Sequence, residues 1–267
     1  MQLQALPPCS PPRGEVAIAA VVFDTFGTVC DFFHPFKRAF EALALAKGVT
    51  CDAAQLAIDW RTADLISTRS QALEETPFVP LYDINRDNLA QLLDSKFPAP
   101  VSADEVAAMA HLWEQLDPWP DTVTGLERIR ASHIIAPLSN GNFSDMLYLA
   151  RYAHLPWDII LGASISGFYK PHASTYRMSC EVLRLPPESV CMVAAHQVDL
   201  AFAAGHGMQT AFVPRPMEFG GATRARDASR DQPSLDAAEV YAEGDWTYIA
   251  TDFIDLAGQL EADAHSP

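Results

Sequence analysis

Hydrophobic and polar positions change their period twice along the chain. Residues 16–24 form a continuous apolar run that ends in an aspartate, which is typical of a strand buried on both faces. Residues from about 34 to 117 then show 3.6-residue periodicity in four stretches, the last preceded by a Ser-x-x-Glu capping box from Ser102 to Glu105. The pattern predicts that this whole block is helical.

From about residue 119, short apolar runs alternate with helical stretches. The segments "HIIAPLS", "DIILGAS", "SVCMVAAH" and "QTAFVPR" are typical of strands. Apolar strands that alternate with helices predict a parallel sheet covered on both faces. The predicted fold class is α/β, with a Rossmann-like, doubly wound parallel sheet as the core domain (16–32 and 119–262). An all-helical cap domain (33–118) is inserted into it.

Composition and charge exclude several classes of partner. A net charge of −16 argues against nucleic acid or an anionic membrane as a partner, and no apolar run approaches the length of a membrane span. Five cysteines without a CxxC pair favour reduced thiols in a cytoplasmic protein. The Pro-rich residues 1–15 lack signal-peptide features and are predicted to be a flexible arm, whereas residues 217–246 show no clear period. An anionic substrate gains nothing from this overall charge, so its site has to contain local cations.

Polar residues gather at one predicted edge of the sheet. They follow the strands or precede a helix there, and they are Asp24, Thr28, Ser139, Asn140, Asn142, Lys170, His196 and Asp199. Ligands of open parallel sheets bind beyond the carboxyl ends of the strands. An aspartate at the end of a buried strand is costly unless it has a role. Each residue alone could be a turn former, a helix N-terminal acid or a surface lysine, but together they predict a site.

Four of these segments resemble the motifs of the haloacid dehalogenase-like hydrolases. They are "VVFDTFGT" (21–28), "LSN" (138–140), "YKP" (169–171) and "VAAHQVDL" (193–200). Phosphatases of that superfamily carry a second aspartate two residues after the nucleophile, and they use Mg²⁺. Here that position is Phe26, so phosphoryl transfer would lack its general acid. An aromatic residue at this point resembles the L-2-haloacid dehalogenase branch.

The resemblance implies an enzyme that hydrolyses short 2-haloalkanoic acids to 2-hydroxy acids and halide, through an aspartyl ester on Asp24. It implies no cofactor and no metal ion. The implied catalytic residues are Asp24, Lys170, Asp199, Arg61 and Thr28. Asp199 is expected to position or deprotonate the hydrolytic water. The implied substrate-binding residues are Thr25, Phe26, Ser139, Asn140, Tyr176 and His196. Arg61 and Asn140 are expected to face the halide, and Thr28, Ser139 and the backbone amides of Thr25 and Phe26 to hold the substrate carboxylate.

Departures from the family pattern leave the substrate open. The fourth motif has Ala194 in place of serine and His196 in place of asparagine, and Thr25 replaces an apolar residue. The segments "LDPWPDTV" and "LSNGN" are similar to a subgroup in which fluoroacetate is turned over, and His196 is expected to donate an N–H to the departing halide. Three alternatives stay open: cleavage of another C–X bond or a strained ring by Asp24, a Mg²⁺-dependent phosphatase, and a non-catalytic binding protein. The oligomeric state also stays open, although relatives are often homodimers.

Overall fold

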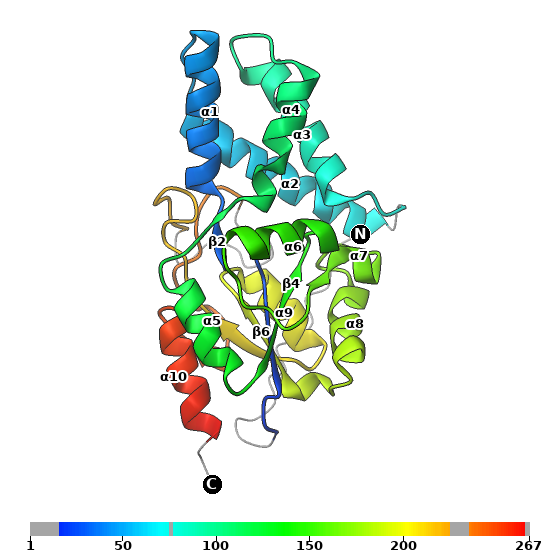
Figure 1. The fold of residues 1–267 in the computed structure, drawn as a ribbon. Helices are drawn as coiled ribbons and strands as arrows, with labels where there is room; N and C mark the ends of the chain where they lie inside the picture. Colours follow the sequence, from blue (N-terminus) through cyan, green and yellow to red (C-terminus); the bar gives the residue numbers. More distant parts are fainter. Residues whose placement is uncertain (1–15, 75–76, 225–234, 265–267) are drawn as a thin grey trace.

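A parallel sheet forms the centre of the protein (Figure 1). The computed structural model describes residues 16–74, 77–224 and 235–264. Its strands are β1 (Ala20–Phe23), β2 (Cys30–Asp31), β3 (Asp117–Pro118), β4 (Ile134–Ser139), β5 (Leu161–Gly162), β6 (Val190–Ala194), β7 (Gln209–Phe212) and β8 (Tyr248–Ile249). Six of them form one sheet in the order β5-β4-β1-β6-β7-β8, with parallel neighbours throughout. β2 and β3 form a separate antiparallel ribbon.

Helices cover both faces of this sheet, and successive residues of β1 show why. Val21 and Phe23 belong to one apolar cluster and Val22 to another, because side chains alternate across a strand. In the core the helices are α5 (Thr122–Arg130), α6 (Phe143–Tyr152), α7 (Ala163–Ser166), α8 (Ala173–Leu183), the 3₁₀ turn η2 (Pro187–Ser189), α9 (Gln197–Gly205) and α10 (Phe253–Ala264). The first cluster takes in side chains of α5 and α10, and the second those of α8 and α9. Burial on both sides accounts for the uninterrupted apolar run of β1.

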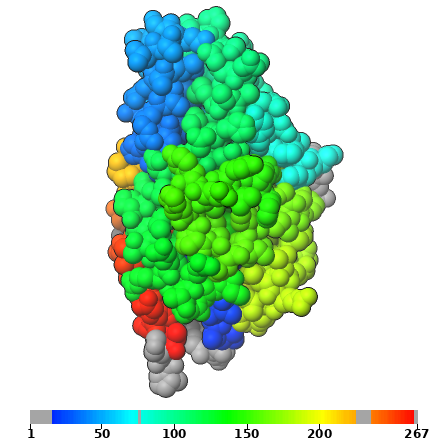
Figure 2. Space-filling model, in the orientation of Figure 1, coloured from blue at the N-terminus to red at the C-terminus, as the bar shows by residue number. Residues whose placement is uncertain are grey.

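A group of helices lies above the carboxyl edge of the sheet (Figure 1). They are α1 (Phe33–Lys47), α2 (Ala53–Glu74), α3 (Leu81–Lys96), α4 (Ala103–Ala110) and the 3₁₀ turn η1 (His111–Glu114). The capping box predicted at Ser102 is present at the start of α4. Tilted and edge-to-face contacts among the rings of Phe36, Trp60 and Trp113 hold the group together, with ring centroids 4.4–5.7 Å apart. In the face shown in Figure 2 this group and the sheet domain touch without an open gap.

The predicted parallel sheet with helices on both faces is confirmed, and two details differ. β1 begins at Ala20 and not at residue 16, because its partners β4 and β6 begin opposite Ala20. The β2–β3 ribbon, which joins the points where the chain leaves and re-enters the core, has strands too short for a period to show. Residues 1–15 lie outside the described residues. Among the described helices, none is both long and apolar enough to cross a membrane.

Part of the segment without a sequence period, 217–246, lies against the start of α9. The structure describes it except for residues 225–234. Glu239 accepts a hydrogen bond from the backbone N–H of Gln197, and the Gln197 side chain bonds the backbone of Tyr241 and Glu243. Each of these contacts is a hydrogen bond made by an individual residue. They therefore produce no periodic pattern of apolar residues in the sequence. The segment thereby fixes the helix end that follows His196.

Candidate active site

A cavity of ≈ 90 Å³ lies beyond the carboxyl ends of β1 and β6 and is lined on one side by α2. Eight of the predicted site residues line it: Asp24, Phe26, Arg61, Asn140, Lys170, Tyr176, His196 and Asp199. Other lining residues come from α2, from α9 and from the loop before α8, namely Leu65, Thr68, Arg69, Pro171, Val198 and Phe202. The space therefore suits a small ligand, and its walls carry both charge and apolar surface.

Asp24 is held at the end of β1 by several donors. Its backbone N–H continues the sheet by bonding to Val193, and the Thr28 hydroxyl donates to its Oδ2 at 2.8 Å. The ammonium of Lys170 donates to its Oδ1, also at 2.8 Å. Burial alone would raise the pKa of Asp24, but Lys170 and His196 outweigh that effect and lower the pKa well below its usual range. Asp24 is therefore a buried, ionised carboxylate that polar and cationic groups hold in place.

Lys170 lies between two carboxylates, Asp24 and Asp199. Its Nζ donates to Asp199 Oδ2 at 2.5 Å, and Tyr176 donates its hydroxyl to the other oxygen of Asp199 at 2.6 Å. Burial lowers the pKa of Lys170, but Asp199 and Asp24 raise it to a net value above the ordinary one, so the ammonium stays charged. Both oxygens of Asp199 already accept from strong donors. Asp199 is thus better placed to hold Lys170 than to take a proton from water.

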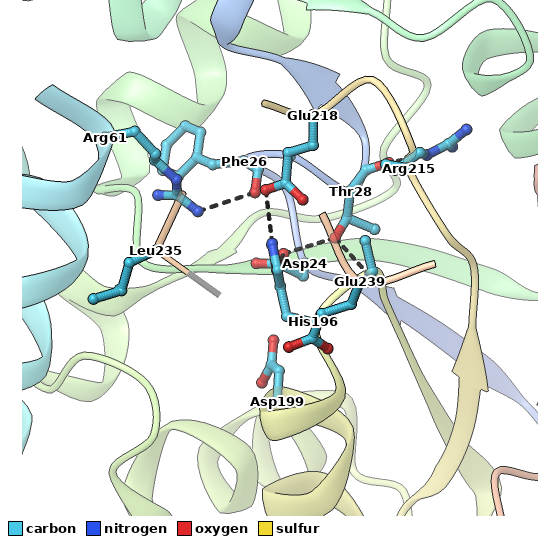
Figure 3. A network of polar contacts seen from close by, with 12 residues as sticks. Asp24, Phe26, Thr28, Arg61, His196, Asp199, Arg215, Glu218, Leu235 and Glu239 are labelled. Carbon is cyan, nitrogen blue, oxygen red and sulfur yellow. Dashed lines mark hydrogen bonds and ion pairs between the residues drawn. The ribbon is translucent and has the colours of Figure 1, made fainter. Parts of the chain in front are cut away.

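His196 connects Asp24 to a second buried carboxylate, which the sequence did not reveal (Figure 3). Its Nδ1 lies 3.0 Å from Asp24 Oδ2, and its Nε2 lies 2.8 Å from Oε1 of Glu218. Burial lowers the pKa of His196, but Glu218 and Asp24 raise it well above the ordinary value. The imidazole is therefore protonated, and both N–H groups face carboxylates. The sequence analysis expects His196 to donate an N–H to the departing halide. In the structure Nδ1 faces Asp24 and Nε2 faces Glu218, so neither ring nitrogen is left for a halide.

The Glu218 side chain packs against Gly27 of the first motif, where the absence of a Cβ leaves space for it. Gly27 has φ +88°, and a Cβ there would lie 2.0 Å from Glu218 Oε1. Glycine is the residue that adopts this backbone region without strain and leaves the space open. Glu218 is 1 % exposed, and its Oε2 has no hydrogen-bond partner among the described residues. It stands in the segment without a sequence period, so the one available signal was the glycine itself.

Arg61 lines the cavity from α2, and both of its terminal nitrogens donate hydrogen bonds to other groups of the protein. Its two terminal nitrogens donate to Asp64 Oδ2 at 2.6 Å and to the backbone oxygen of Phe26 at 3.2 Å (Figure 3). The guanidinium also lies over the rings of Phe32 and Trp113, 5.4 and 5.9 Å from their centroids. Its Nε is buried and has no partner among the described residues. The spacing of Asp64 three residues after Arg61 is a usual ion-pair spacing on a helix and could have revealed it.

Three predicted residues lie close by but outside the cavity lining, and they are Thr25, Thr28 and Ser139. The Thr28 oxygen accepts from the backbone N–H of Ala195 while its hydroxyl donates to Asp24, so it links the first and fourth motifs. Ser139 Oγ accepts from the N–H of Gly141. Asn140 lines the cavity, and its Oδ1 accepts from the backbone N–H of Lys170. Their roles in binding a substrate carboxylate stay predictions.

The described residues hold no group of three or more His, Cys, Asp or Glu side chains arranged to bind a metal ion. The two carboxylates in the cavity lining, Asp24 and Asp199, both accept hydrogen bonds from the Lys170 ammonium. An ammonium in this place reduces the repulsion between Asp24 and an anionic ligand. The arrangement places an ionised carboxylate beside an aromatic wall, which is chemically compatible with a carboxylate nucleophile.

Comparisons with known proteins agree with this geometry. A family model described as haloacid dehalogenase-like hydrolase matches residues 18–207. The "(S)-2-haloacid dehalogenase 4A" of Burkholderia cepacia is 27% identical over 204 residues, covering 74% of this chain and 84% of that protein. A solved structure of a defluorinating L-2-haloacid dehalogenase has a TM-score of 0.82 and 36% identity, covering 95% of this chain and 99% of that one. Another L-2-haloacid dehalogenase has a TM-score of 0.80 and 35% identity, covering 92% and 100%. The resemblance of the motifs is confirmed: the chain belongs to the haloacid dehalogenase-like hydrolases.

Proposed function

We propose that this protein hydrolyses the carbon–halogen bond of short 2-haloalkanoic acids and releases halide and a 2-hydroxy acid. The observation that carries the proposal is Asp24, ionised by Lys170 and facing Phe26 in a cavity of ≈ 90 Å³. The haloacid dehalogenases among its relatives support the same reaction. We also propose that residues 33–118 act as a cap that closes the cavity through α2. The homodimer and the cytoplasmic location stay predictions.

In the first step, an Asp24 oxygen attacks the carbon that bears the halogen. The new C–O bond forms as the C–X bond breaks, and the electron pair leaves with the halide. Halide needs hydrogen-bond donors and no proton, so an apolar ring at position 26 is compatible with the step. Arg61 and Asn140 line the cavity and supply such donors. Excluding water with the cap keeps the carbon centre open to Asp24 alone.

In the second step, water attacks the ester carbonyl of Asp24, and His196 acts as the base. Ester formation removes the charge of Asp24, which was one of the two carboxylates holding the His196 proton. Nδ1 then loses its proton to solvent, and this is the one proton that the overall hydrolysis releases. The neutral Nδ1 accepts a proton from the attacking water, while Nε2–H stays bonded to Glu218. Collapse of the tetrahedral intermediate breaks the bond between the Asp24 carbonyl carbon and the ester oxygen, and the departing alkoxide takes the second water proton to become the hydroxy acid. Asp24 is then ionised again, and His196 keeps the first water proton.

A panel of substrates tests the reaction. We expect halide release from 2-chloropropionate and 2-bromopropionate at undiminished rate in excess EDTA, because Lys170 supplies the positive charge at Asp24. Ion chromatography would measure the halide. A strict need for Mg²⁺ together with phosphate release from phosphate monoesters would support the phosphatase instead. Opening of a strained ring without any halide release would support the related C–X hydrolase.

Fluoroacetate belongs in that panel. The relative at 36% identity is a defluorinating enzyme, and a cavity of ≈ 90 Å³ suits a small acid. We propose that fluoroacetate is also a substrate, and that fluoride release is detectable with a fluoride electrode. Chloride release from chloroacetate without fluoride release from fluoroacetate would restrict the enzyme to the heavier halogens.

His196→Asn tests the second step. We expect the ester on Asp24 to accumulate, because the first step keeps its nucleophile while water loses its base. Intact-mass spectrometry after mixing with 2-chloropropionate should show the added acid, and overall turnover should fall by about 10²–10⁴-fold. The exposed pair His111–Glu114 offers a matched control, and His111→Asn should behave as the native enzyme. Loss of turnover without any ester would instead assign His196 to the first step.

A further inference from the structure

The arginine that α2 contributes to the cavity, Arg61, is paired with a buried carboxylate of its own helix. Its Nη1 donates to Asp64 Oδ2 at 2.6 Å, and the two side chains are 5 % and 2 % exposed. Asp64 does not line the cavity, and its Oδ1 is buried without a hydrogen-bond partner among the described residues. Asp64 therefore balances the charge of Arg61 from outside the cavity.

Arg61 keeps donors for a halide in spite of its bonds to the protein. A guanidinium has five N–H groups. One is given to Asp64 and one to the backbone oxygen of Phe26, while Nε is buried without a partner among the described residues. Arg61 lines the cavity beside Leu65 and Thr68. A departing halide thus finds N–H groups there, but the ion pair that supplies them has no net charge.

The charge of Asp64 acts across the site. Burial raises the pKa of Asp64, Arg61 opposes that rise, and the Asp24 carboxylate adds to it, so Asp64 lies within electrostatic range of the nucleophile. Solvent screens such buried charges only weakly. An uncompensated guanidinium would attract the halide as it forms, but it would also retain the halide as a product. A counterion behind the guanidinium limits that retention.

From this arrangement we propose that Asp64 sets how tightly the free halide is held at Arg61, and thereby lets the halide leave. The inference rests on the proposed dehalogenation, and Asp64 is a positioning residue that acts through Arg61. The halogen of the substrate carries no full charge until the C–X bond breaks, so Asp64 affects the free halide more than the substrate. The substrate carboxylate, expected at the backbone amides of Thr25 and Phe26, is affected less.

Halide binding by Asp64→Asn tests the proposal, because asparagine keeps the size of the side chain and an acceptor for Arg61 but removes the charge. We expect chloride and bromide to bind about 10- to 100-fold more tightly than to the native protein, by calorimetry at constant ionic strength. Chloride should inhibit turnover of 2-chloropropionate at correspondingly lower concentrations. The affinity for propionate should change by less than about threefold. A purely structural role of Asp64 would weaken halide binding, which is the opposite direction.

Two further variants separate charge from geometry. Asp59 lies on the same helix, pairs with Lys96 and does not line the cavity, so Asp59→Asn is the matched control. It should bind halide as the native protein does. Asp64→Glu restores the negative charge beside Arg61, and its halide affinity should return toward the native value.

Thermal unfolding gives a readout that tolerates a weakened fold, since Asp64→Asn leaves Arg61 without its counterion. Chloride that binds the folded variant should raise its Tm more steeply with concentration than the Tm of the native protein. Asp64→Ser repeats the measurements should the asparagine variant not fold. Native or weaker halide affinity in these variants, or an equal gain for propionate, would overturn the proposal. Tighter chloride binding by Asp64→Asn, with no halide release from any haloacid by the native protein, would contradict the proposed reaction alone.

Discussion

Asp24→Asn is expected to lower halide release by more than about 10⁴-fold, to below detection. An amide is no comparable nucleophile, and the substitution changes neither the size of the side chain nor its place at the end of β1. The carboxylate it removes accepts from Thr28 and Lys170. Halide release from each of the panel substrates would be measured with the native enzyme as reference.

An isotope experiment distinguishes loss of a nucleophile from loss of a general base. In a single turnover in ¹⁸O-water with excess native enzyme, the label should enter Asp24, and the hydroxy acid should carry unlabelled oxygen. Peptide mass spectrometry would locate the label. Label in the hydroxy acid of the first turnover would show that water attacks the carbon directly, and the ester scheme would be wrong.

The sheet was predictable because its signal is repeated along the chain. Each buried strand produces an apolar run, as β6 does with five successive buried residues, and each covering helix has its own 3.6-residue period. The helical insertion was predictable for the same reason. The β2–β3 ribbon was not, since two residues per strand are too few to show alternation. The segment that covers the start of α9 was not, since individual polar contacts, such as that between its Glu239 and Gln197 of α9, hold it there.

The residues of the site also fall into those that the sequence predicted and those that it did not. Asp24, Lys170 and Asp199 stand at strand ends or next to a helix start, where the topology of a parallel sheet brings them together. Glu218 reaches His196 from a segment without period, and its position depends on the open space above Gly27. Arg69 is one of many charged residues on a long helix, and only the cavity marks it as part of the site. Local sequence thus finds residues that regular elements position, and misses those that irregular segments and exposed faces contribute.

Charge compensation by a single ammonium is expected to make Lys170 the most sensitive position after Asp24. Lys170 is 9 % exposed and holds two carboxylates that are 7 % and 6 % exposed, Asp24 and Asp199. Removal of one member of a buried ion pair leaves an uncompensated charge, which costs about 3–5 kcal/mol. The same ammonium keeps the pKa of Asp24 low. Stability and catalysis should therefore fall together when it is replaced.

Lys170→Met is expected to lower kcat/KM by about 10³-fold or more and to destabilise the fold by about 3–5 kcal/mol at pH 7.5. Without the ammonium, burial raises the pKa of Asp24, so less of the carboxylate is ionised. Denaturant unfolding would measure the stability, and steady-state halide release the activity. Lys47, which pairs with Glu105 on the surface of the helical insertion, supplies the control. Lys47→Met should leave the activity and the unfolding midpoint nearly unchanged.

The pH dependence of Lys170→Met follows from the direction of the Asp24 pKa shift. In the native protein the depressed pKa means that Asp24 contributes stability at pH values above its unfolded pKa near 3.8, and that this contribution is lost only as the pH falls through the folded pKa. Native activity should therefore show no acidic limb from Asp24 between pH 5 and 8. In Lys170→Met the pKa of Asp24 rises, because burial is then opposed by His196 and no longer by the ammonium, so kcat/KM should begin to fall at a higher pH than in the native enzyme, and the destabilisation should become smaller where protonation removes the buried charge. In the Asp24→Asn background the same lysine substitution should destabilise less, because one of the two carboxylates is already gone. An equal destabilisation in both backgrounds, together with a flat acidic profile of Lys170→Met, would show that Lys170 does not hold Asp24 in its ionised form.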